Sequence, residues 1–298
     1  MKHAAVGCLM GLGGWLLLAL VWAGLLQWRF EAPLAETLGV STLAGLMSYV
    51  ALTLLHAAWQ SWRERAAITS GRAGTPPADG KRAVLVGTVE ALGPLLRAPL
   101  DGSACVAYDY RITEDRGSGR RRMILTHFKG TGLAPCEIVT RSGRHRLLTV
   151  PDLQSRSPAG PSSGHVAAFE RYARATPFTG SDTAANELVA RWTDDDGAYR
   201  SDVSYVPLAS IDLTRCMLAQ QQVRAGAMVC AIGWYSKARG GLVPSPTWAG
   251  NPRLIEGDVN ELVHTLGATA RRRLLLGAAA ALASGGLVAA FVNYWQEE

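Results

Sequence analysis

A long uncharged stretch near the N-terminus places the strongest constraint on this chain. Residues Ala4–Trp28 include no Asp, Glu, Lys or Arg. As an α-helix that rises about 1.5 Å per residue, this run is longer than the roughly 30 Å hydrocarbon core of a bilayer. A signal peptide is the alternative, but the apolar segment is too long for one, and no clear small-x-small cleavage site follows it. We therefore expect a membrane-spanning helix over residues 4–28.

Two further runs have the same character. Thr37–Trp62 follows the first run after a short break, and Leu274–Trp295 lies near the C-terminus. Tryptophan and tyrosine side chains gather near the ends of these runs, where amphipathic rings favour the membrane interface. The sequence thus predicts a transmembrane helical hairpin over residues 4–62 and a C-terminal transmembrane helix over residues 274–295, three spans in all.

The lysine and arginine pattern predicts the orientation. The flanking basic residues on one side are Arg63, Arg65, Arg72 and Arg271–Arg273, whereas the opposite side offers only Arg29. The positive-inside rule then places residues 63–273 in the cytoplasm, where cysteines are kept reduced. We expect an integral membrane protein whose soluble domain is cytoplasmic.

The segment between the spans predicts a linker followed by a β-rich domain. Residues 63–82 are expected to be a linker, because residues 66–82 are small, polar and proline-containing. Residues 83–265 contain many short β-branched runs separated by glycine turns, which indicates an α+β domain built as a small barrel or a sandwich. Strands are expected over 83–89, 105–112, 123–128, 136–141, 145–150, 188–193, 198–206, 223–235 and 242–244. A turn at Ser142–Arg144, a loop insertion at 154–165, a short helix at 166–176 and a helix from Asp258 toward the last span complete the prediction.

The segment Pro94–Ile112 has the clearest local pattern of the soluble part. From Cys105 to Ile112, apolar or aromatic side chains alternate with small or charged ones, as in a strand with one buried face. Pro99–Gly102 supplies turn chemistry directly before it, because proline fixes one torsion and Asp-Gly tolerates positive φ. The segment is therefore expected to be structural.

Candidate binding residues are few. A basic cluster, with members Arg116, Arg120, Arg121 and Arg122, is a candidate for contacts with lipid phosphates, the alternative being a solvated hairpin tip. The three carboxylates of Asp194–Asp196 are expected to be a solvated turn, because they lack EF-hand spacing. The pI near 9.2 owes much to the arginines that flank the spans, so we expect no nucleic-acid partner.

The sequence contains no catalytic or metal signature. The five cysteines are widely spaced and the six histidines are scattered, which argues against a disulfide framework and a zinc site. His127 and Cys136 would have to meet across strands to share a metal, and two ligands are too few. We expect no metal, no cofactor and no recognisable active site.

Several short motifs together resemble a known family. Gly87–Val89 followed by Pro94–Tyr110, and more weakly Ala134–Ile138 and Arg224–Gly233, resemble the GIDE family of membrane-anchored proteins. The β-rich module of that family is called the "beside a membrane" (BAM) domain, and the resemblance covers residues 83–265. Its residues here, expected to be structural, are Pro99, Leu100, Gly102, Cys105, Tyr108, Gly226 and Gly233.

The resemblance implies a membrane-anchored, non-catalytic binding, scaffold or sensor module, with membrane lipids and a protein or peptide as partners. The alternative is a component of ubiquitin-like transfer, since eukaryotic relatives are E3 ubiquitin ligases with a RING finger. No cysteine–histidine cross-brace occurs in this chain, and Cys105 is the one weak catalytic candidate. The alanine- and arginine-rich composition is typical of bacteria, which implies the bacterial inner membrane.

Overall fold

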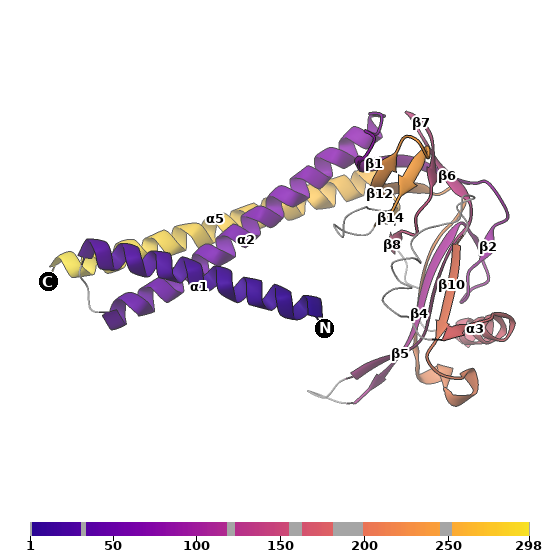
Figure 1. Ribbon diagram of the computed structural model, residues 1–298, viewed down its shortest axis with the longest axis horizontal. Coiled ribbons are helices and arrows are strands. Elements are labelled where there is room, and N and C mark those ends of the chain that lie inside the picture. Colours follow the sequence, from indigo (N-terminus) through magenta and orange to yellow (C-terminus); the bar gives the residue numbers. More distant parts are fainter. Residues whose placement is uncertain are drawn as a thin grey trace. The chain divides into compact units, whose positions relative to one another are not determined.

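The computed structural model describes residues 2–30, 34–117, 123–154, 163–180, 199–244 and 252–297. The chain forms two compact units. One comprises residues 1–66 and 263–298, and the other comprises residues 67–262. The three long helices of the first unit are α1 (Lys2–Phe30), α2 (Leu34–Arg72) and α5 (Val259–Glu297), and the second unit is rich in strands (Figure 1).

Within the described residues, two helical segments are long and apolar enough to cross a membrane, Ala35–Arg72 and Val259–Tyr294. They include the predicted second span and the predicted third span up to Tyr294. The predicted first span lies in α1, whose described apolar part, Gly13–Trp28, is shorter. By length and composition, two of the described helices could therefore cross a membrane. A third span stays a prediction.

The helices of the first unit pack through small residues and polar contacts. A Cβ atom placed on Gly45 of α2 would lie 2.6 Å from the backbone nitrogen of Ala19 in α1, so these backbones nearly touch. Ser48 accepts a hydrogen bond from the Trp22 indole at 3.1 Å and lies 3.0 Å from the Ser284 hydroxyl of α5. Small residues and interhelical hydrogen bonds of this kind are typical of helices that associate in lipid.

A closed barrel lies at the centre of the second unit. Its described strands are β1 (Lys81–Ala91), β6 (Cys136–Thr140), β7 (Gly143–Leu147), β13 (Gly241–Val243) and β12 (Met228–Ser236). They pair in that order, and β12 pairs again with β1, which closes the ring. The pairings are antiparallel except for β7 with β13. Because β12 returns beside β1 after the β1–β6–β7 meander, this is a five-stranded Greek-key barrel, the architecture of OB-folds.

The barrel is filled by aliphatic side chains from alternate strand positions. Its buried residues include Leu85, Val89, Ile138, Leu147, Ala231, Leu242 and Leu254. Two short strands, β14 (Arg253–Glu256) and β8 (Asp152–Gln154), extend the sheet beyond β12. A β-rich domain built as a small barrel or a sandwich was expected from the many short strands, and the described strands form the barrel.

A second sheet forms from segments inserted between barrel strands. Its order is β11 (Met217–Val223), β4 (Ala107–Arg116), β5 (Met123–Leu133), β10 (Tyr199–Ser204) and β9 (Thr179–Gly180). Helix α3 (Ser163–Ala175) covers one face, where Phe169 packs against Tyr110 and Phe128 (Figure 1). Tyr108 and Tyr110 are each 1% exposed, so the alternation read from the sequence correctly identified the buried face of β4. The short elements β2 (Leu96–Arg97), β3 (Ala104–Cys105), η2 (Leu208–Ser210) and η3 (Leu213–Arg215) complete the unit.

The predicted linker begins later than expected. Helix α2 continues through Trp62 to Arg72, so the first half of the 63–82 segment is helical. The reason is that no proline interrupts residues 63–72, and Ile68, which is 0% exposed, gives this turn of the helix a buried contact. The predicted hairpin around residues 194–197 and most of the 154–165 insertion lie outside the described residues.

Candidate functional site

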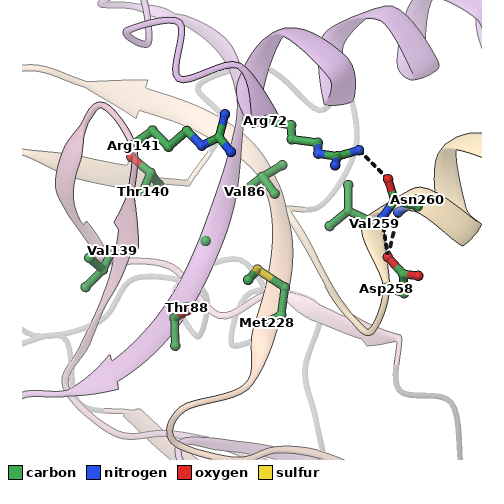
Figure 2. A pocket seen from close by; sticks show the side chains of 11 residues that line it. Arg72, Val86, Thr88, Val139, Thr140, Arg141, Met228, Asp258, Val259 and Asn260 are labelled. Carbon is green, nitrogen blue, oxygen red and sulfur yellow. Dashed lines mark hydrogen bonds between the residues drawn. The ribbon is translucent and has the colours of Figure 1, made fainter.

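A pocket of about 400 Å³ lies in the second unit beside strand β1 (Figure 2). Its lining comes from the end of α2, from β1, from the end of β6, from the start of β12 and from the start of α5. The lining residues are Arg72, Val86, Gly87, Thr88, Val139, Thr140, Arg141, Met228, Asp258, Val259 and Asn260. A volume of this size is in the range of small-molecule sites.

Strand register brings the central lining residues together. In the barrel, Thr88 lies opposite Met228 of β12 on one edge of β1 and opposite Val139 of β6 on the other. Val86 and Thr88 share one face of β1, because side chains alternate along a strand. The pocket therefore depends on β1 being paired along both edges, which is a property of the closed barrel.

The α5 side of the pocket is a fixed polar cluster. Asp258 caps the start of α5, since its Oδ1 accepts the backbone N–H of Asn260 at 2.8 Å and the side-chain amide of Asn260 at 3.1 Å. Arg72, the last residue of α2, donates from Nη1 to Oδ1 of Asn260 (Figure 2). The Arg72 guanidinium is thus held by a neutral amide, and its charge is not cancelled by that partner.

Arg141 is the second cation of the pocket. Figure 2 shows its side chain extending from the end of β6 toward Val86. Over the described ranges, no carboxylate or carbonyl pairs with its guanidinium. The neighbouring Thr140 hydroxyl is already engaged, since it donates to the carbonyl of Gly143 at 2.9 Å and accepts the Ser142 N–H at 3.1 Å. Among the described residues, the guanidinium donors of Arg141 are therefore unpaired.

The chemistry of the lining favours binding over catalysis. It combines valine side chains, a methionine, threonine hydroxyls, two arginines and one carboxylate. Neither a nucleophile with an adjacent base nor a pair of carboxylates is among these side chains, and such pairings are what acyl transfer and glycoside hydrolysis require. The arrangement can hold a ligand that has both a negative and an apolar part.

The residues at 99–102 that carry the resemblance lie in the β2–β3 hairpin and not in the pocket. Pro99 and Leu100 are buried, and Gly102 has φ +69°, which favours glycine. Two side-chain hydrogen bonds connect the hairpin to β11. The side-chain oxygen of Gln220 accepts the Leu100 N–H at 2.7 Å, and the side-chain amide of Gln222 donates to the Asp101 carboxylate at 3.0 Å. These contacts give the motif a structural role.

Cys105, the catalytic candidate, lies in β3 and is 0% exposed. Burial, with a smaller contribution from the nearby Asp101 carboxylate, raises the pKa of its thiol to about 12. Because the thiolate is the nucleophile in thiol chemistry, very little of the reactive form exists at neutral pH. Tyr108, in the neighbouring strand β4, is also buried and its hydroxyl lies 3.0 Å from that of Tyr172.

The remaining predicted residues are dispersed. Gly226, with φ +82°, forms the turn before β12, two residues before the pocket-lining Met228. Gly233 lies within β12, where a Cβ atom would be 3.3 Å from Pro252. Arg116 forms an ion pair with Glu114 at 2.9 Å, whereas Arg120, Arg121 and Arg122 lie outside the described residues.

The described residues contain no group of three or more His, Cys, Asp and Glu side chains that would hold a metal ion. His127 contacts the Glu114 carboxylate at 2.9 Å, while Cys136 is buried in the barrel core. The two residues considered together from the sequence thus have separate environments.

Sequence reasoning missed the pocket itself. Arg72 was used only to orient the membrane spans, and Asp258 only to mark the start of a helix. Thr88 and Met228 lie in segments that carry the family resemblance, but neither was predicted to be a site residue. Their proximity arises from strand pairing between distant segments, which no local pattern signals. Comparison of the chain with protein-family models, with curated proteins and with solved structures gave no match.

Proposed function

We propose that this chain is a membrane-anchored, non-catalytic binding module whose ligand site is the pocket beside β1. The observation that carries the proposal is the pocket with two arginines, neither of which is paired with a carboxylate among the described residues. The two helices with membrane-crossing length and composition supply lining residues directly, since α2 ends at Arg72 and α5 begins at Val259. Ligand binding would therefore engage residues that belong to the anchoring helices.

The setting of the module is part of the proposal. The arginines that flank the apolar runs support a cytoplasmic position for the β-rich unit, in a bacterial inner membrane. The resemblance to GIDE proteins supports a role beside the membrane, with lipids and a protein or peptide as partners. A part in ubiquitin-like transfer has less support, because the buried Cys105 thiol has a raised pKa and is poorly suited to carry a transferred group.

Photocrosslinking from the pocket tests the proposal. The full chain, expressed in its membrane, would carry benzoylphenylalanine in place of Met228, which lines the pocket and is 49% exposed. The matched control places the same group at Met217, which is 58% exposed on β11 and does not line the pocket. We expect irradiation to attach one defined small molecule or lipid at position 228 and none at position 217, as read by mass spectrometry of the purified chain. No adduct at 228, or the same mixture at both positions, would contradict a ligand site in this pocket.

A further inference from the structure

We propose that the group recognised by this pocket is a phosphate, carried by a small molecule or by a lipid headgroup. This inference rests on the proposed function, because it names the ligand class of the same site. Its basis is the charge, the free hydrogen-bond donors and the apolar surface that the lining residues bring together.

The charge of the lining is positive. Arg72 and Arg141 contribute two positive charges, and Asp258 contributes the one negative charge among the lining side chains. Oδ1 of Asp258 is occupied by two hydrogen bonds from Asn260, so this carboxylate acts as the cap of α5. In Figure 2, Asp258 lies on the α5 side and Arg141 on the β6 side, so an anion near Arg141 would avoid the carboxylate. The pocket therefore favours a negatively charged ligand group.

The free donors match an oxyanion with several acceptor oxygens. A guanidinium carries five N–H donors in a planar fork that pairs with phosphate through two parallel hydrogen bonds. Arg141 has all of its donors available within the described structure, and the hydrogen bond from Arg72 to Asn260 uses only Nη1. The Thr88 hydroxyl, on the same face of β1 as Val86, adds a neutral donor from a third element. The unpaired fork of Arg141, in a lining that also holds Arg72 and the Thr88 hydroxyl, suits a phosphate better than a carboxylate, because phosphate offers more acceptor oxygens and a charge of up to two.

The rest of the lining is mainly apolar and suits the hydrocarbon portion of a ligand. Val86 and Val259 are 9% and 6% exposed and form an apolar surface, while Met228 remains half exposed at the opposite side from Arg72 (Figure 2). An unbranched, polarizable methionine adapts to ligands of irregular shape. A phosphate ester with a short apolar portion, such as a glycerol phosphate unit, combines both requirements.

The test uses the full chain in phosphatidylcholine nanodiscs, with two probes. One arm titrates sn-glycerol 3-phosphate by calorimetry, and the other measures by native mass spectrometry whether phosphatidic acid is retained over phosphatidylcholine from an equal mixture. Each arm compares Arg141→Gln with Arg82→Gln, an exposed arginine on β1 that does not line the pocket and whose loss changes the net charge equally. We expect Arg141→Gln to weaken binding of the probe about tenfold or more, as loss of a charge-assisted hydrogen-bonded pair implies, and Arg82→Gln to leave it unchanged.

The outcomes distinguish a soluble phosphate ester from a lipid headgroup, and they distinguish failure of the phosphate assignment from failure of the proposed binding function. Arg141-dependent binding of the soluble probe identifies a soluble phosphate ester, and Arg141-dependent retention of phosphatidic acid alone identifies a lipid headgroup. Binding of neither probe, or equal loss in both variants, would overturn the phosphate assignment. If the crosslink at position 228 nevertheless captures a ligand without phosphorus, the binding function stands and only the ligand class is wrong.

Discussion

Replacing Gly87 by valine will strongly destabilise the barrel, whereas replacing Gly93 by valine will leave its stability nearly unchanged. A Cβ atom on Gly87 would lie 2.0 Å from the carbonyl oxygen of Val139 and 2.7 Å from its carbonyl carbon, both in the backbone of β6. Strand β1 cannot move away, because β12 pairs with its other edge. We expect a loss of unfolding free energy on the order of 4 kcal/mol, the range in which a forced core rearrangement becomes severe.

The control glycine has room for a side chain. A Cβ atom on Gly93 would lie 3.7 Å from the Pro135 ring, an ordinary van der Waals contact. Urea unfolding of the full chain in detergent, followed by amide hydrogen exchange in β1, β6 and β12, measures both variants. An unchanged midpoint for Gly87→Val would mean that β1 and β6 are not in contact at this residue.

Replacing Asp202 by alanine will loosen α3 from the second sheet. Asp202 is 5% exposed, and its Oδ1 accepts the Tyr110 hydroxyl at 2.9 Å and the Tyr172 hydroxyl at 2.8 Å. Its Oδ2 accepts Nε of Arg200 at 2.8 Å. Removing the carboxylate leaves two hydroxyl groups and a guanidinium without their shared acceptor, and we expect this to lower the free energy of unfolding by about 3 kcal/mol. The loss is not larger because the half-exposed Arg200 side chain regains some hydration.

An exposed carboxylate provides the comparison for this change. Asp152→Ala on β8 removes an acidic group from the surface and is expected to alter stability by less than about 0.5 kcal/mol. Amide exchange in α3, β4 and β5 reports the difference locally. Equal protection in Asp202→Ala and Asp152→Ala would contradict a central role for the Asp202 cluster.

Local sequence patterns predicted the parts of this fold that depend on local chemistry. The alternation from Cys105 to Ile112 correctly placed Tyr108 and Tyr110 on a buried face. The β6–β7 hairpin was correctly expected, but its turn is formed by residues 141–142, and Gly143 and Arg144 of the predicted turn already belong to β7. The long apolar runs at both ends correspond to helices. In each case the signal lies in neighbouring residues, so no information about distant segments was needed.

Features made by distant segments could not be read in the same way. Barrel closure pairs Lys81 of β1 with Tyr235 of β12. The strands β7 and β13 pair in parallel, so no short turn joins them and no turn sequence predicts their pairing. The pocket draws on five separate elements, and Tyr110 meets Asp202 across 92 positions of sequence. The end of the helix at Arg72 was missed because small polar residues suggest a linker, whereas burial of Ile68 favours continued helix.

The proposed function requires that the apolar helices hold the β-rich unit at the cytoplasmic face of a membrane. Met217→Cys places a thiol at a position that is 58% exposed, while Cys105, Cys136, Cys216 and Cys230 are buried. The unaltered chain is the control, because it measures any labelling of the five native cysteines, Cys8 included. Bacterial cells that express the variant would be treated with a membrane-impermeant maleimide, intact or lysed, and the membranes then extracted with alkaline carbonate. We predict that the chain stays in the membrane pellet and that the introduced thiol reacts only after lysis. Release by carbonate, or labelling of intact cells, would contradict a cytoplasmic, membrane-anchored module.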